Sequence, residues 1–164
     1  MKILLIAMLC GIALFIGYKI SKKYKNRYIF FQSMVMLCQK FDVEMNYSKE
    51  RIKNIIINLD EKHKKNLFGI DANYISFLNQ ESPLNEDSLF KNIQFLKQDE
   101  KNVLFMFFKS LGRSDLDSQS KEIKNNLSRF EGYCKDTEAE HKKYSALSIK
   151  LGIVASLFII ILFI

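Results

Sequence analysis

The sequence contains few residues that interrupt helices. Its 164 residues include one proline and six glycines. Proline and glycine are the residues that most often end helices and strands, so their scarcity favours long helices. No segment of useful length alternates apolar and polar residues as a half-buried strand does. We therefore predict an all-α protein.

Cysteine and histidine are also scarce. Cys10, Cys38 and Cys134 are odd in number and far apart, which argues against a disulfide framework or a zinc site. We expect Cys10 to lie in lipid and the other two to act as small apolar side chains on helices. His63 and His141 are far apart as well. We expect His63 on a solvated surface and His141 on a packed or half-exposed helix face.

The motifs of common catalytic sites are missing. The sequence has no Walker loop, no glycine-rich dinucleotide fingerprint and no nucleophile elbow. The net charge is +7, but no aromatic-basic module accompanies it, so nucleic-acid binding is not predicted. We expect a non-enzymatic protein with no catalytic residue, metal or cofactor, whose work is binding and positioning.

What the sequence does have is an apolar segment at each end. Ile3–Tyr18 and Leu151–Ile164 carry no charged residue. Both are shorter than the roughly 20 residues that a spanning helix needs, but Lys19 and Lys150 can extend their amines to the headgroups. A cleaved signal peptide would need its positive charge before the apolar run, whereas here the charge follows it. The C-terminal segment could instead be a buried core helix. However, a helix that is apolar on every face belongs in lipid or in a large core, and a chain of this size has no such core.

Basic residues flank each apolar segment on the side that faces the middle of the chain. Because cationic flanks stay in the cytoplasm, both termini are predicted outside and the middle inside. We predict membrane-spanning helices at 1–18 and 151–164 and a cytoplasmic helical bundle at 19–150. The first cluster is also expected to bind anionic lipid headgroups. Its members are Lys19, Lys22, Lys23, Lys25 and Arg27.

The bundle is predicted to hold about six helices, the first continuing from the membrane to about Tyr47. Apolar residues recur at helical spacing from Phe30 to Met45. Ser48 is the expected N-cap of a second helix. Val103–Phe108 marks a further helix in the second half of the chain.

Two short helices are predicted between these. Gly69 is expected to stop one helix, and Asp71 to cap the next, which holds Tyr74. Pro83 fits the first turn of another, which carries Leu89, because proline has no N–H to leave unpaired there.

The last helix is predicted to begin with a capping box in which Ser114 pairs with Asp117. From Ile123 its apolar residues alternate steps of four and three, as in a coiled-coil seam. The seam becomes polar at Thr137 and His141, so we expect pairing to weaken toward the membrane.

Small residues recur at a spacing of four within the apolar segments. These residues allow two membrane helices to approach closely, and they indicate a contact between the two spans. The pairs are Ala7 with Gly11, Ala13 with Gly17, and Gly152 with Ser156.

The stretch Leu111–Gln119 and the later run from Lys143 to Gly152 resemble the stage III sporulation protein AB family. That family has a Leu-Gly-x-x-Asp-x-x-x-Gln signature, a long helix and a Leu-Gly entry to the last span. Glu44–Tyr47 also fits the family's Glu-x-x-Tyr element. Ser48–Arg51 departs from the family's Thr-Pro-Leu at the start of the second helix.

The resemblance implies a membrane protein of a secretion-like channel between mother cell and forespore, located in the outer forespore membrane. Its soluble part is expected to resemble the F-type platform proteins of type II secretion systems. The implied partners are the stage III sporulation ATPase, protein AA, and other stage III channel proteins.

We take the family signature as the candidate partner-binding site: Leu111, Gly112, Ser114, Asp115 and Gln119. Capping alone explains several of these residues, but it does not explain Gln119. Asp115→Ala or Gln119→Ala is therefore expected to weaken ATPase binding without loss of helicity. The alternative is a membrane-anchored coiled-coil scaffold that forms a homo-oligomer through the seam at Ile123–Cys134.

Overall fold

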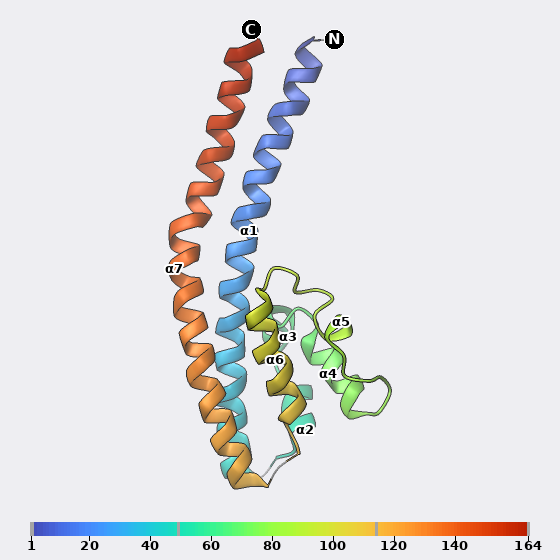
Figure 1. Cartoon of the computed structure of the whole chain (residues 1–164). Coiled ribbons are helices and arrows are strands. Elements are labelled where there is room, and N and C mark those ends of the chain that lie inside the picture. The colour runs from blue at the N-terminus through green and yellow to red at the C-terminus, as the bar shows by residue number, and fades with distance from the viewer. Residues whose placement is uncertain (1, 49, 114, 164) are drawn as a thin grey trace. The chain divides into compact units, whose positions relative to one another are not determined.

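The computed structural model describes residues 2–48, 50–113 and 115–163, and these residues form helices and connecting loops without a strand. The prediction of an all-α fold is therefore confirmed (Figure 1). The elements are α1 (Lys2–Val43), a π-helical turn η1 (Glu44–Ser48), α2 (Ile52–Ile57), α3 (Glu61–Asn66), α4 (Ile70–Leu78), α5 (Glu86–Leu89), α6 (Gln98–Ser110) and α7 (Leu116–Phe163).

The chain divides into two compact units, and α1 and α7 contribute to both. One unit, which we call the helix pair, comprises Met1–Tyr28 and Lys135–Ile164. The other, which we call the bundle, is Ile29–Cys134 and contains all the short helices. This division concerns compactness and not the membrane boundary, so the predicted boundaries at 18 and 151 stay predictions.

The core of the bundle is rich in phenylalanine. Phe30 and Phe31 of α1 are fully buried, as is Phe130 of α7. The Phe130 ring lies 6.5 Å from that of Phe31 and 5.3 Å from that of Phe107 on α6. Each such side chain contributes about 1.5–3 kcal/mol by leaving water. The three longest helices are thus held together by a shared aromatic contact.

The first half of the seam is occupied within the chain. Ile123 is fully buried, and Leu127 and Cys134 pack against the core cluster. The Phe31 ring lies 5.1 Å from that of Tyr133. The α7 face that suggested a coiled coil therefore packs inside the bundle.

Three predicted helix starts were wrong. Ser48 does not cap α2, because the helical path of α1 continues through η1 as far as Ser48, and α2 begins at Ile52. Pro83 is not in a first turn, because Asn85 caps α5 by accepting a hydrogen bond from the Ser88 N–H at 2.7 Å. The cap of α4 is Gly69 rather than Asp71. Gly69 has φ +89°, a left-handed conformation that glycine adopts without strain.

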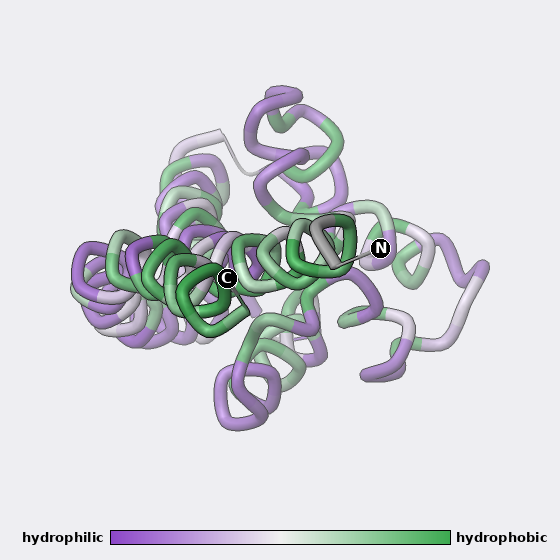
Figure 2. Tube along the Cα trace, turned by 90° about the horizontal axis from the view of Figure 1, so that it is seen from above, coloured by the Kyte–Doolittle hydropathy of each residue, from purple (hydrophilic) through white to green (hydrophobic). Residues whose placement is uncertain are grey.

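In the helix pair, α1 and α7 are each long and apolar enough to cross a membrane. Figure 2 shows the ends of both helices, near the labels N and C, coloured as hydrophobic. Many of their apolar side chains are exposed, including Leu4, Phe15, Leu157 and Phe158. Exposed apolar surface on this scale fits a lipid environment.

The two helices approach closely at Gly17 and Gly152, both of which are buried. A Cβ atom at Gly17 would lie 2.7 Å from the Ser148 carbonyl oxygen and 3.3 Å from the Gly152 Cα. The Ser156 hydroxyl donates to the Cys10 carbonyl at 3.3 Å. A Cβ at Gly11 would meet nothing within 4 Å. The predicted contact between small residues is confirmed for Gly17 and Gly152, and it was wrong for Gly11.

Contacts between α1 and α7 continue where the seam becomes polar. Thr137 is only 1% exposed. The polar residues of α7 contact polar or aromatic side chains of α1. These contacts could not be predicted from the apolar pattern of α7 alone. These pairs are Ser21 with Ser145 at 2.6 Å, Tyr24 with Tyr144 at 5.3 Å between rings, Arg27 with Glu140, and Tyr28 with His141 at 5.9 Å between rings.

Candidate partner-binding surface

The loop after α6 is fixed by a buried tyrosine. Leu111, the C-cap residue of α6, is 5% exposed, and its carbonyl accepts a hydrogen bond from the Tyr74 hydroxyl at 3.3 Å. Burial raises the pKa of Tyr74 above its ordinary range, so the hydroxyl keeps its proton as a donor. Gly112 follows with φ +79°, where a side chain would be strained. Leu111 and Gly112 thus set the path of the chain between α6 and α7.

Tyr74→Phe is expected to lower the free energy of unfolding by about 1–2 kcal/mol, because the Leu111 carbonyl loses its donor. Chemical denaturation of the detergent-solubilised full chain measures the change. Tyr47→Phe is the matched control, since Tyr47 is 85% exposed. An equal change in both variants would contradict the anchoring role of Tyr74.

The N-terminus of α7 is capped by Asp115. Its carboxylate accepts a hydrogen bond from the Ser118 N–H at 3.1 Å, and α7 begins at Leu116. This bond lowers the pKa of Asp115 below its usual range. The predicted cap, Ser114, lies outside the described residues. Among the described residues, the cap bond of α7 comes from Asp115, and the predicted pairing of Ser114 with Asp117 stays a prediction.

Asp115→Ala is expected to lower the melting temperature at pH 7, because α7 loses its cap. Since the folded state lowers the pKa of Asp115, this stabilisation is present above the ordinary pKa of about 3.9 and is lost as the pH falls below it. The difference from wild type should shrink at acid pH in thermal circular dichroism. Asp117→Ala, two residues along the same turn, is the control. An undiminished difference at acid pH would argue against the cap.

Gln119 is buried, whereas the cap residue Asp115 is exposed. Its side chain is 4% exposed, and its Nε2 has no hydrogen-bond partner among the described residues. Its backbone N–H donates to the Asp115 carbonyl at 2.9 Å. The predicted site is therefore not one surface: Gly112 and Asp115 are exposed, whereas Leu111 and Gln119 are buried. Of these four described residues, a partner can touch Gly112 and Asp115 directly.

The basic cluster in the helix pair also separates into two kinds of residue. Lys19, Lys22, Lys23 and Lys25 are exposed, and the Lys19 amine lies 5.0 Å from the centre of the Phe15 ring. Arg27 is only 4% exposed and pairs with Glu140. The prediction of headgroup binding stays open for the four lysines, but it does not fit Arg27, whose guanidinium is engaged inside the helix pair.

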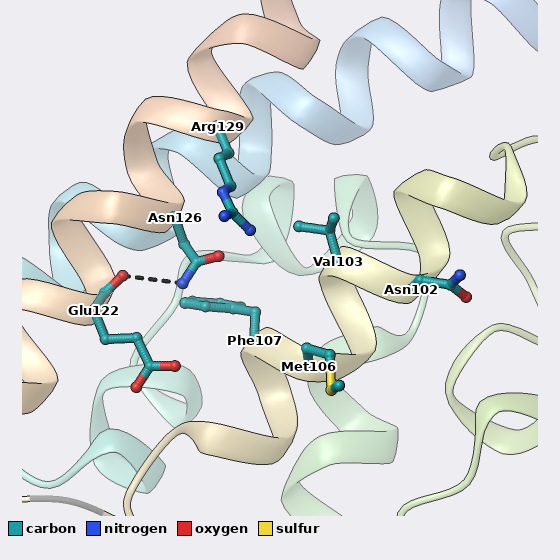
Figure 3. A pocket seen from close by; sticks show the side chains of 7 residues that line it. All are labelled: Asn102, Val103, Met106, Phe107, Glu122, Asn126 and Arg129. Carbon is teal, nitrogen blue, oxygen red and sulfur yellow. Dashed lines mark hydrogen bonds between the residues drawn. The ribbon is translucent and has the colours of Figure 1, made fainter.

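A groove that sequence reasoning missed lies between α6 and α7 in the bundle, and we call it the α6–α7 groove; Figure 3 shows the side chains that line its first part. It consists of two adjoining hollows of about 270 and 360 Å³ that share Met106 and Glu122. The first is lined by Asn102, Val103, Met106, Phe107, Glu122, Asn126 and Arg129. The second is lined by Met106, Lys109, Ser110, Arg113 and Glu122.

Met106 is the most exposed apolar side chain of the groove, at 66%. Its neighbour Phe107 is 1% exposed and turns its ring toward α7. The helical spacing of the sequence does indicate which side chains of α6 face away from the core. Leu104, Phe107 and Phe108 share the buried face of α6, and Met106 falls outside it.

The comparison with protein families gives a match over the whole length of the chain. The model of stage III sporulation protein AB covers residues 2–164. The chain belongs to the stage III sporulation protein AB family. Searches of curated proteins and of solved structures each gave no match. The resemblance inferred from the signature at Leu111–Gln119 is confirmed. Family membership supports a role in sporulation and suggests other stage III sporulation proteins as partners.

Proposed function

We propose that this chain is a non-enzymatic membrane platform protein of a sporulation channel, and that it docks the cytosolic stage III sporulation ATPase. The observation that carries the proposal is the continuity of α1 and α7. Each helix runs from an apolar end into the bundle without a break in its helical assignment. A protein bound to the bundle is then joined to both candidate spans through helix rather than through flexible linker.

In this proposal the chain supplies binding and position, and ATP hydrolysis belongs to the partner. The termini lie outside the cytoplasm and the bundle lies on the mother-cell side of the outer forespore membrane. The proposed orientation is supported by the exposed lysines of both helices, which follow the first apolar segment and precede the second. They are Lys19, Lys22, Lys23 and Lys25 of α1 and Lys142, Lys143 and Lys150 of α7.

The coiled-coil scaffold has less support. Ile123 and Phe130 lie on the seam that would have to join two chains, and both are fully buried within this one. Self-association through that face would require α1 and α6 to leave it. A single chain already satisfies the apolar pattern that suggested an oligomer.

Vesicle flotation tests the proposal. The full chain is reconstituted into liposomes, purified stage III sporulation ATPase is added, and the vesicles are floated through a density gradient. The ATPase should float with vesicles that contain the chain and remain at the bottom with empty vesicles of the same lipids. Recovery of the ATPase at the bottom in both cases, with the chain folded and inserted, would refute the docking function.

A further inference from the structure

The α6–α7 groove has an apolar centre and a basic margin. Met106 is exposed and lines both hollows. Methionine adapts its shape to a partner at low cost, and methionine and arginine are enriched in protein interfaces. Val103 adds further apolar surface from α6. An apolar side chain of a partner can therefore be buried here.

The charges around this centre are unequal. Lys109, Arg113 and Arg129 contribute three cations, all exposed, and Glu122 contributes one carboxylate. None of these three cations takes part in the ion pairs found among the described residues. Their positive charge therefore remains available, and it lies at both ends of the groove, with Arg129 in one hollow and Lys109 and Arg113 in the other.

We infer that the α6–α7 groove binds an acidic segment of the cytosolic ATPase that carries an apolar anchor residue. The anchor packs on Met106 and Val103, and carboxylates on either side of it meet Arg129 and Arg113. Arginine binds carboxylates through paired, charge-assisted hydrogen bonds, which favours an acidic partner over a neutral one. This inference rests on the proposed function and identifies the chemistry of its contact.

The test uses the full chain in nanodiscs and titrates purified ATPase onto it, with empty nanodiscs as the blank. Met106→Glu places a carboxylate at the apolar centre and is expected to weaken binding by about tenfold or more. Met36→Glu is the matched control, because Met36 is a 46% exposed methionine on α1 outside the groove. Met106→Leu should retain nearly wild-type affinity. Circular dichroism of each variant confirms that helicity is kept.

A second pair of variants tests the charge. Lys109→Glu should slow association and reduce the salt dependence of binding, since charges at the rim of an interface act mainly on the encounter rate. Lys62→Glu, an exposed position on α3, should do neither.

The outcomes separate the two proposals. If the wild-type chain binds no ATPase, the proposed function fails, and this inference fails with it. If wild type binds but Met106→Glu binds equally well, or if Lys109→Glu binds more tightly, only the groove assignment is overturned. It is also overturned if Met106→Glu instead dissociates a dimer of this chain in sedimentation equilibrium while ATPase binding is unchanged. Loss of binding by Met106→Glu, with retention by Met36→Glu and Met106→Leu, supports it.

Discussion

Gly17→Leu is expected to separate α1 from α7 in the helix pair. Even a Cβ at this position would lie 2.7 Å from the Ser148 carbonyl oxygen, and a backbone atom cannot move aside as a side-chain tip can. The helices must shift apart, at a cost of roughly 1–3 kcal/mol, as for other overpacked contacts. Membrane helices associate largely through the close van der Waals packing that small residues allow. Contacts with lipid are therefore not expected to replace the packing energy that is lost when the helices move apart.

Cysteine cross-linking measures this separation. The Cys10 thiol donates to the Ser156 carbonyl at 3.5 Å and the Ser156 hydroxyl donates to the Cys10 carbonyl at 3.3 Å, so Ser156→Cys brings a second thiol into the neighbourhood of Cys10. Cys134→Ala removes one competing thiol, and Cys38 is fully buried, with a pKa raised by burial, so it remains a poorly reactive thiol.

In that background, copper phenanthroline should link positions 10 and 156 efficiently. Gly17→Leu should reduce the linked peptide strongly, whereas Gly11→Leu should not, because nothing lies within 4 Å of a Cβ at Gly11. Equal loss in both variants would show that added bulk in the span, rather than the contact at Gly17, is responsible.

Phe130→Ala is expected to lower the free energy of unfolding by about 3–5 kcal/mol, as large-to-small changes at buried aromatic residues do. The ring is fully buried between Phe31 of α1 and Phe107 of α6, so its removal leaves a cavity where three helices meet. Denaturant unfolding of the detergent-solubilised full chain measures the loss.

This variant also separates the platform from the coiled-coil scaffold. If Phe130 served an interface between chains, its removal would change the oligomeric state and spare the single chain. Met36→Ala removes a 46% exposed side chain from α1 and should change the unfolding free energy by less than about 0.5 kcal/mol. A small effect of Phe130→Ala, together with loss of an oligomer, would favour the scaffold.

Much of the fold could be predicted from periodicity alone. The apolar stripe from Phe30 to Met45 and the run around Phe107 predicted helices correctly, because the apolar face of an amphipathic helix packs against the core. The starts of the short helices were less predictable. Ser48 and Pro83 are both good local signals, but the helical path continues through η1 to Ser48, and Asn85 supplies the cap of α5.

The candidate site was predicted only in part, for a related reason. The signature at Leu111–Gln119 identified the family, yet it mixes buried and exposed residues that linear sequence cannot sort. The sequence groups Arg27 with the lysines that are predicted to bind headgroups, whereas in the structure Arg27 forms an ion pair with Glu140. Met106 is adjacent in sequence to the core residue Phe107, and only the packing of α6 against α7 shows that it lines a groove.

The most direct test of the platform account is site-specific photo-cross-linking in sporulating cells that make this protein. A photoreactive amino acid is placed at Met106 in the α6–α7 groove and, in a separate strain, at Met36 outside it. The account predicts a covalent adduct with the stage III sporulation ATPase, identified by mass spectrometry, from position 106 and not from position 36. An adduct with the ATPase from neither position, in cells where the chain is inserted and the ATPase is present, would contradict it.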